Sequence, residues 1–130
     1  MILIIGGAYE GKTEYAADFL KINPDEILDG DTCPVQKAFS AVCIKNFHKL
    51  VKRLINDEID SIDFVHRLIQ ENNNLIVITD EIGCGIIPAN KSDRLWRETV
   101  GRVCSLIASE SECVIRLSCG IPTVIKGELL

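Results

Sequence analysis

The residues with the clearest chemistry lie near the start of the chain, where glycine, lysine and threonine recur at a fixed spacing. Residues 6–13 read G-G-A-Y-E-G-K-T and match the pattern G-x-x-x-x-G-K-T. Gly6 and Gly11 permit backbone conformations and a close approach that a Cβ would prevent, so consecutive amide N–H groups can point at one anion. We therefore predict a phosphate-binding loop made of Gly6, Gly7, Ala8, Tyr9, Glu10, Gly11, Lys12 and Thr13.

Two side chains at the end of this loop can act on a bound nucleotide. We expect Lys12 to reach the β- and γ-phosphates, and Thr13 to offer its hydroxyl to a Mg²⁺ ion that bridges them. An apolar run at residues 1–5 precedes the loop and a helical pattern follows it, which is the context that the motif requires. The predicted ligand is a nucleotide with its Mg²⁺.

A pair of acidic residues follows a second apolar run, at residues 75–79. Asp80 could support the Mg²⁺ ion, while Glu81 could orient the attacking group or accept its proton. Lys12, Asp80 and Glu81 are therefore the candidate catalytic residues, and Thr13, Asp80 and Asp29 are the candidate metal ligands. Asp29 and Asp31 follow another short apolar run, and helix capping is an equal alternative for both.

The pattern of apolar residues predicts an α/β fold with a mostly parallel sheet. Because ligands collect at the carboxyl ends of parallel strands, we expect the phosphate loop, residues 29–31 and residues 80–81 to converge. Strands are expected at residues 1–5, 26–28, 75–79, 114–117 and 123–125, the last two around a turn at 120–122. Helices are expected at residues 12–21, from residue 31 or 32 to 55 as the longest, at 59–69, and from 92 or 93 to 109.

Length and composition restrict the class of protein. The 130 residues form one predicted domain, residues 1–130, and 47% of them are apolar, which suits a compact globular chain. We expect a cytoplasmic protein without membrane contact, because no apolar run approaches the length of a membrane span and no charged leader opens the chain. The net charge of −5 argues against a nucleic-acid surface, so phosphates must be bound by local cations.

The six cysteines do not suggest a metal site or a disulfide framework. None of them forms a C-x-x-C pair, and each lies in an apolar or loop context. We interpret them as small, buried thiols.

Four segments resemble one family, the adenosylcobinamide kinase and adenosylcobinamide-phosphate guanylyltransferase family of cobalamin synthesis. Residues 1–13 look like its G-G-A-R-S-G-K-S opening, and residues 79–88 are similar to its T-N/D-E-V-G-x-G-I-V-P segment. Residues 94–103 match an R-x-F-R-D-x-x-G-R-V helix, and residues 118–126 match an S-G-I-P end. The resemblance implies a three-layer phosphate-loop NTPase related to RecA-like folds, and a homo-oligomer.

The resemblance also implies an activity. Such an enzyme uses ATP or GTP to phosphorylate a hydroxyl on a corrinoid side arm, and then transfers GMP through a histidine intermediate. The match favours Arg97 and Arg102 as phosphate contacts, although pairing with residues such as Glu98 explains them equally well. Gly101, inside the predicted helix, suggests close packing against a neighbouring strand or subunit.

The chain departs from the family pattern at places that affect this activity. The family carries its nucleophilic histidine between the first helix and the strand that ends at Asp29, a segment that is short here and contains no histidine. His48 and His66 lie in helical stretches elsewhere, so we expect the kinase reaction rather than guanylyl transfer. Two alternatives remain: a catalytically idle nucleotide-binding module for regulation or assembly, and a kinase for another small hydroxylated metabolite.

Overall fold

In the described part of the chain, six strands form one sheet, and five of them are parallel. The structure is a computed structural model that describes residues 1–7, 11–82 and 90–128. The strands lie in the order β2-β3-β4-β1-β5-β6, with β6 antiparallel to β5. Their bounds are β1 Ile2–Gly6, β2 Ile27–Asp29, β3 Cys43–Lys45, β4 Ile76–Asp80, β5 Cys113–Ser118 and β6 Ile121–Lys126. The predicted α/β fold with a mostly parallel sheet is confirmed.

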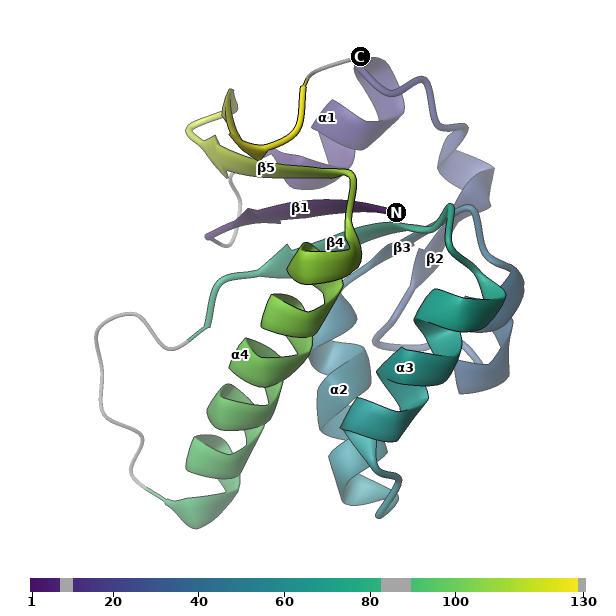
Figure 1. The fold of residues 1–130 in the computed structure, drawn as a ribbon, viewed down its shortest axis with the longest axis vertical. Helices are drawn as coiled ribbons and strands as arrows, with labels where there is room; N and C mark the ends of the chain where they lie inside the picture. Colours follow the sequence, from purple (N-terminus) through teal and green to yellow (C-terminus); the bar gives the residue numbers. More distant parts are fainter. Residues whose placement is uncertain (8–10, 83–89, 129–130) are drawn as a thin grey trace.

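Helices cover both faces of this sheet. α1 (Lys12–Asp18) lies on one face, whereas α2 (Phe47–Asn56), α3 (Ser61–Glu71) and α4 (Lys91–Glu110) lie together on the other (Figure 1). Two short 3₁₀ helices, η1 (Pro24–Glu26) and η2 (Val35–Ser40), lie in the connections before β2 and before β3. No helix within the described ranges is long and apolar enough to cross a membrane.

Burial on both faces explains why the central strands have uniformly apolar sequences. In β1, Leu3 packs into the core beneath α2, α3 and α4, and Ile4 packs into the smaller core beneath α1. Val77 and Ile78 alternate in the same way along β4. Because successive side chains of a strand point to opposite faces, a strand that is covered on both sides needs apolar residues throughout.

The predicted long helix ending at residue 55 is wrong in its first half. The structure has η2 and then β3 in this region, and α2 begins only at Phe47. Cys43 and Ile44 are both fully buried, but on opposite faces of the sheet between β2 and β4. An apolar pair of this kind fits a helical stripe as well as a short buried strand, and the sheet decides between them. The longest described helix is instead α4, with 20 residues.

The hairpin at the end of the described chain places its turn earlier than predicted. Cys119 and Gly120 have positive φ values of 52° and 76°, so the chain reverses there, and Ile121 and Pro122 already belong to β6. The strands predicted at 114–117 and 123–125 are confirmed within β5 and β6. Pro122 is tolerated because β6 lies at the edge of the sheet.

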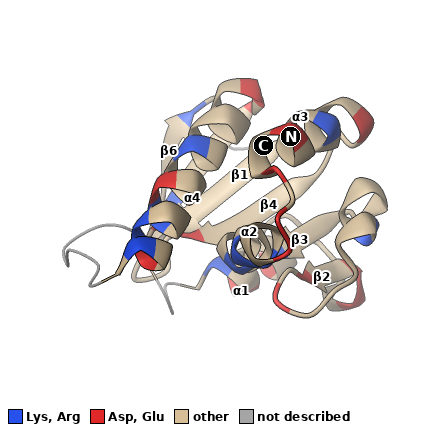
Figure 2. Cartoon of the chain, turned by 90° about the horizontal axis from the view of Figure 1, so that it is seen from below, with Lys and Arg blue, Asp and Glu red and all other residues tan. Residues whose placement is uncertain are grey.

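Charged side chains of both signs are distributed over α4. Figure 2 shows basic and acidic residues interspersed along this helix, which is described over its full length. The helix therefore presents no continuous basic stripe.

Candidate functional site

The chain enters the candidate site where β1 ends and α1 begins. β1 ends at Gly6, and Gly11 directly precedes α1 with a φ of 83°, in the left-handed region that favours glycine. The predicted loop residues Ala8, Tyr9 and Glu10 lie outside the described residues. The flanking strand and helix that the glycine-rich motif requires are both present.

Lys12 and Asp80 form an ion pair at the carboxyl end of the sheet. The Lys12 Nζ lies 2.8 Å from the Asp80 Oδ1, and it also donates a hydrogen bond of 2.6 Å to the carbonyl oxygen of Gly7. The parallel pairing of β1 with β4 brings the two together, because it places Gly6 opposite Asp80. The Lys12 side chain is only 7% exposed and that of Asp80 is 25% exposed. Two of the predicted catalytic residues are thus in direct contact.

Thr13 is the second residue of α1 and is partly exposed. Among the described residues, no group forms a hydrogen bond with its hydroxyl. Together with the Asp80 carboxylate it offers oxygen atoms, which are the ligands that Mg²⁺ prefers. These two residue types fit a Mg²⁺ ion. Within the described ranges, however, no group of three or more His, Cys, Asp or Glu residues could hold a metal by itself.

Glu81 has a partner that the sequence did not reveal. The Arg116 Nε donates a hydrogen bond of 3.0 Å to the Glu81 Oε1, and the Arg116 Nη2 contacts the same oxygen. Arg116 lies in β5, and the Glu81 backbone N–H donates to the carbonyl oxygen of Gly6 in the adjacent β1. The one available signal was a charged residue within the apolar run of β5.

His48, considered above only as a candidate nucleophile, lies beside Asp80, which the sequence did not reveal. It lies at the start of α2, is 4% exposed, and its Nδ1 accepts a hydrogen bond of 3.2 Å from the backbone N–H of Asp80. The His48 Nε2 lies 3.5 Å from the Asp80 Oδ2. Burial lowers the pKa of His48 below its ordinary value, although the charge of Asp80 acts in the opposite direction. No sequence signal connects His48 with Asp80, because their contact depends on β3, which was not predicted.

Asp29 lies at the same edge of the sheet, but β3 separates its strand from that of Asp80. The register places Asp29 level with Ile78, two residues before Asp80. At about 4.8 Å between strands and 3.3 Å per residue, roughly 12 Å separates the two backbone positions. The Asp29 Oδ1 accepts hydrogen bonds from the Asp31 N–H and the Asn46 Nδ2, at 2.9 and 3.0 Å. Burial acts to raise the pKa of Asp29, but these hydrogen bonds and nearby lysine charges lower it overall. The Asp29 carboxylate therefore stabilises the turn that follows β2. Its role as a metal ligand stays a prediction.

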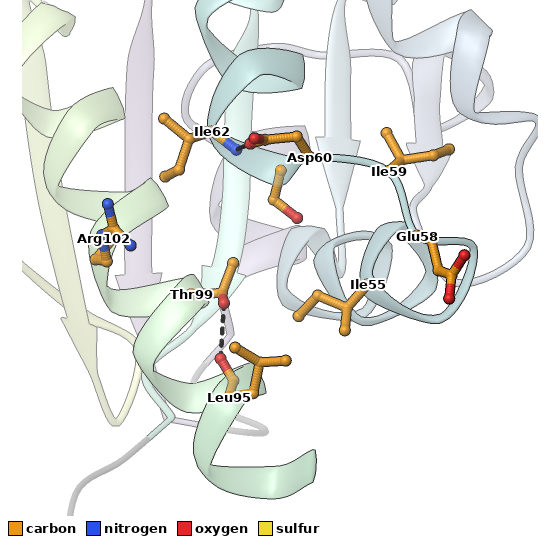
Figure 3. Close-up of a pocket in the computed structure, with 9 residues that line it drawn as sticks. Ile55, Glu58, Ile59, Asp60, Ile62, Leu95, Thr99 and Arg102 are labelled. Atoms are coloured by element: carbon orange, nitrogen blue, oxygen red, sulfur yellow. Dashed lines mark hydrogen bonds between the residues drawn. The ribbon is translucent and has the colours of Figure 1, made fainter. Parts of the chain in front are cut away.

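The two candidate arginines of α4 are not equivalent. Arg97 is partly buried, whereas Arg102 is exposed and lines a cavity of about 350 Å³ between α4 and the start of α3 (Figure 3). Val100 lines a different cavity, beside Asp80. Since two residues turn an α-helix by about 200°, Arg102 lies on the other side of α4 from Val100. The structure does not bring Arg102 to Lys12, and its phosphate contact stays a prediction.

A cavity of about 230 Å³ lies beside the acidic pair, on the α4 side of the sheet. Its described lining consists of Ile5, Asp80, Glu81, Ile82, Val100, Gly101 and Cys104. The predicted close packing of Gly101 against a neighbouring strand is wrong, since a Cβ there would meet nothing within 4 Å in the described chain, and its packing against another subunit stays a prediction. The absence of this side chain leaves room next to the two carboxylates.

The cysteines agree in part with the prediction of buried thiols. Cys33, Cys43 and Cys113 are buried and Cys104 is partly buried, but Cys119 is exposed, and Cys84 lies outside the described residues. Burial raises the pKa of Cys43 to about 12 and that of Cys104 to about 11. Cys33, Cys43, Cys104 and Cys113 are free thiols.

The fold and the site define a class of protein. It is an α/β protein with a mostly parallel sheet, a glycine-rich loop between β1 and α1, and an acidic pair at the end of the neighbouring β4. Residues 35–125 match a family model described as CobU, cobinamide kinase / cobinamide phosphate guanyltransferase. This match covers well over half of the chain, and the chain belongs to this family. No match was found among the curated proteins.

Membership in this family implies a phosphate-loop NTPase and suggests a nucleotide-binding function of the cobinamide kinase/guanylyltransferase type. The match includes the acidic pair, α4 and most of the final hairpin, and it begins after the phosphate loop. The loop and the family model are therefore separate observations, from different parts of the chain, that support the same class.

Proposed function

We propose that the protein is a Mg²⁺-dependent kinase that transfers a phosphoryl group from ATP or GTP to a hydroxyl group of a small molecule. The observation that carries the proposal is the 2.8 Å contact between Lys12, at the start of α1, and Asp80, at the end of β4. The family's description as cobinamide kinase supports a corrinoid as the acceptor.

The residues around this contact have separate tasks in the proposed reaction. Lys12 and the backbone of the loop would bind the β- and γ-phosphates, and Thr13 and Asp80 would hold Mg²⁺ through oxygen atoms. When bound, Mg²⁺ neutralises charge on the phosphate oxygens. Lys12 then leaves Asp80 for the nucleotide.

Transfer requires an acceptor hydroxyl close to the γ-phosphate and a group that takes its proton. The hydroxyl oxygen forms a bond to the γ-phosphorus, and the bond from that phosphorus to the bridging oxygen breaks, leaving its electron pair on the nucleoside diphosphate. Glu81 accepts the proton of the hydroxyl. Its place beside the 230 Å³ cavity supports this role, since an acceptor group entering there would meet its carboxylate.

The histidines support the kinase reaction over guanylyl transfer. A guanylyl-histidine intermediate needs an imidazole nitrogen free to attack an α-phosphate. His48 is buried, and its Nδ1 already accepts the Asp80 N–H. His66 is exposed in the middle of α3, a helix that packs against α4, α2 and η2.

One observation favours a second function, a nucleotide-binding module without turnover. Lys12 and Glu81 already have ionic partners within the chain, so their charges are balanced without a ligand. This module would bind nucleotide and support regulation or assembly. The third alternative, a kinase for another hydroxylated metabolite, differs only in the acceptor.

Nucleotide binding and turnover together test the proposal. Calorimetric titration with ATP and GTP, with and without Mg²⁺, should show Mg²⁺-dependent binding that Lys12→Ala abolishes. Lys37→Ala, at an exposed lysine of η2, is the matched control and should bind normally. Labelled γ-phosphate should then appear on cobinamide. Binding without transfer to any acceptor supports the module. Absence of Mg²⁺-dependent binding by the wild type refutes the kinase, and absence of any nucleotide binding refutes both.

A further inference from the structure

His48 is a buried polar residue whose two ring nitrogens contact Asp80, and its Nδ1 also lies 3.5 Å from the Thr79 hydroxyl oxygen. The Asp80 N–H donates to Nδ1 at 3.2 Å, and Nε2 lies 3.5 Å from Oδ2 of the same residue. Because Nδ1 accepts a hydrogen bond, it carries no proton, and the neutral ring then has its proton on Nε2. The histidine thus contacts both the backbone and the carboxylate of one residue.

The far side of His48 is fixed by α4. The Trp96 Nε1 donates a hydrogen bond of 2.8 Å to the His48 carbonyl oxygen, and the centres of the two rings lie 6.3 Å apart. The Lys52 Nζ lies over the Trp96 ring, 4.8 Å from its centre. The backbone of His48 is therefore held by a contact that does not involve Asp80.

The two oxygens of Asp80 consequently have different neighbours. Oδ1 lies 2.8 Å from Lys12, and Oδ2 faces the His48 ring. A continuous chain of contacts runs from Trp96 on α4, through His48 on α2, to Asp80 on β4 and Lys12 on α1. Residues of four different elements thus meet in one chain of contacts around this carboxylate.

The polar ring of His48 sets it apart from the other buried residues of α2. The remaining buried positions of α2 are occupied by Phe47, Leu50, Val51 and Leu54, so an apolar side chain is the ordinary choice there. What the imidazole adds is an acceptor for the Asp80 N–H and a donor beside the Asp80 carboxylate.

We propose that His48 is a positioning residue for Asp80, which holds the carboxylate in the orientation that supports Mg²⁺ beside the nucleotide phosphates. The proposal rests on the proposed function, because it gives Asp80 its metal role. Groups that orient a metal-binding side chain commonly change metal affinity by roughly 10- to 100-fold when they are replaced.

Three variants separate positioning from packing. His48→Phe keeps a ring of similar shape without either nitrogen. His48→Asn places an amide oxygen near the position of Nδ1, where it can accept the Asp80 N–H. Trp96→Phe leaves His48 in place but removes the hydrogen bond that fixes it. Thermal unfolding by circular dichroism identifies the variants that fold.

The readout is binding of a fluorescent ATP analogue by the full chain, titrated with Mg²⁺ and again in excess EDTA. We expect His48→Phe to weaken the apparent Mg²⁺ affinity by roughly 10-fold or more, with unchanged binding in EDTA. His48→Asn should restore most of the loss, and Trp96→Phe should show a smaller loss of the same kind. Equal weakening with and without Mg²⁺, or no weakening in His48→Phe, would overturn the positioning role.

A measurement on the wild type tests the same geometry without a mutation. Nitrogen-15 NMR at neutral pH should show the His48 ring with its proton on Nε2. A proton on Nδ1 would contradict the contact with the Asp80 N–H and overturn the proposal. If the wild type shows no Mg²⁺-dependent nucleotide binding at all, the proposed function fails. If the wild type binds nucleotide with Mg²⁺ and His48→Phe has the same apparent Mg²⁺ affinity, the positioning role fails while the proposed function stands.

Discussion

Arg116 holds Glu81: its Nε donates a hydrogen bond of 3.0 Å to the Glu81 Oε1 and joins the middle of β5 to the acidic pair that follows β4. The Glu81 backbone is held as well, through its N–H bond of 2.8 Å to the Gly6 carbonyl oxygen. Glu81 is thus fixed at both its backbone and its carboxylate. The Nε and the Nη2 of Arg116 both contact the same carboxylate oxygen, Oε1.

Glu81→Gln tests the proposed proton acceptor. Glutamine keeps the shape of the side chain but cannot take the proton of the acceptor hydroxyl, so we expect kcat to fall about 100-fold or more. The nucleotide Kd should stay near the wild-type value, because Glu81 does not bind the phosphates in this scheme. Glu71→Gln, which removes an exposed pair with Arg67 on α3, is the control. Unchanged turnover in Glu81→Gln would exclude the base role.

Removing Asp80 should lower the free energy of unfolding more than removing Lys12 does. Asp80→Ala leaves the Lys12 ammonium buried and uncompensated, and we expect a loss of about 3 kcal/mol in the free energy of unfolding. Lys12→Met leaves a carboxylate that is already 25% exposed, so the loss should be roughly 1 kcal/mol. Urea denaturation measures both. Equal losses would contradict the difference in burial on which this prediction depends.

Two glycines should give opposite effects when replaced by alanine. A Cβ at Gly101 meets nothing within 4 Å, and glycine inside a helix is less favourable than alanine, so Gly101→Ala should stabilise the protein by roughly 0.5–1 kcal/mol. A Cβ at Gly30 would lie 2.7 Å from the carbonyl oxygen of Asn46, so Gly30→Ala should destabilise it by about 1–3 kcal/mol. Thermal unfolding checks both, and stabilisation by Gly30→Ala would contradict the described loop.

Stability should decrease at alkaline pH because of Cys43. Its pKa is raised by burial from an ordinary value of 9.0 to about 12, so above pH 9 the unfolded chain loses this proton while the folded chain keeps it. The stabilising contribution is complete below pH 9 and decreases as pH rises towards 12. At pH 10 the loss from Cys43 alone is about 1.4 kcal/mol.

Denaturant midpoints at pH 8 and pH 10 test this dependence. Cys43→Ala should lower stability at pH 8, because it removes a buried side chain, but should decrease less between the two pH values than the wild type does. A pH dependence that is identical in the two proteins would show that the Cys43 thiol does not titrate as its burial requires.

The sequence predicted the parts of the site that depend on local motifs and on one rule of topology. Lys12 follows from the glycine-rich spacing, and Asp80 from its place at the end of an apolar strand. Their convergence, though not their direct contact, followed from the tendency of ligand-binding residues to gather at the carboxyl ends of parallel strands. No pairing between strands had to be known for this prediction.

The parts that were missed depend on which strands are neighbours. β3 has three residues, and its buried pair Cys43 and Ile44 also fits a helical stripe, so no local signal marks it as a strand. Without β3, neither the contact of His48 with Asp80 nor the separation of Asp29 from Asp80 could be deduced. The contact of Arg116 with Glu81 likewise depends on the order of the strands, in which β5 lies next to β1 and β1 next to β4.

The ion pair between Lys12 and Asp80 makes nucleotide binding an exchange of partners. Phosphate oxygens must replace Asp80 as the partner of Lys12, and a cation must replace Lys12 as the partner of Asp80. Once one of these exchanges has separated the pair, the other requires less free energy. We therefore expect nucleotide and Mg²⁺ to bind with positive cooperativity, each raising the affinity for the other by the same factor. The affinity measured for nucleotide alone, or for Mg²⁺ alone, would be weaker, because separating Lys12 from Asp80 costs free energy.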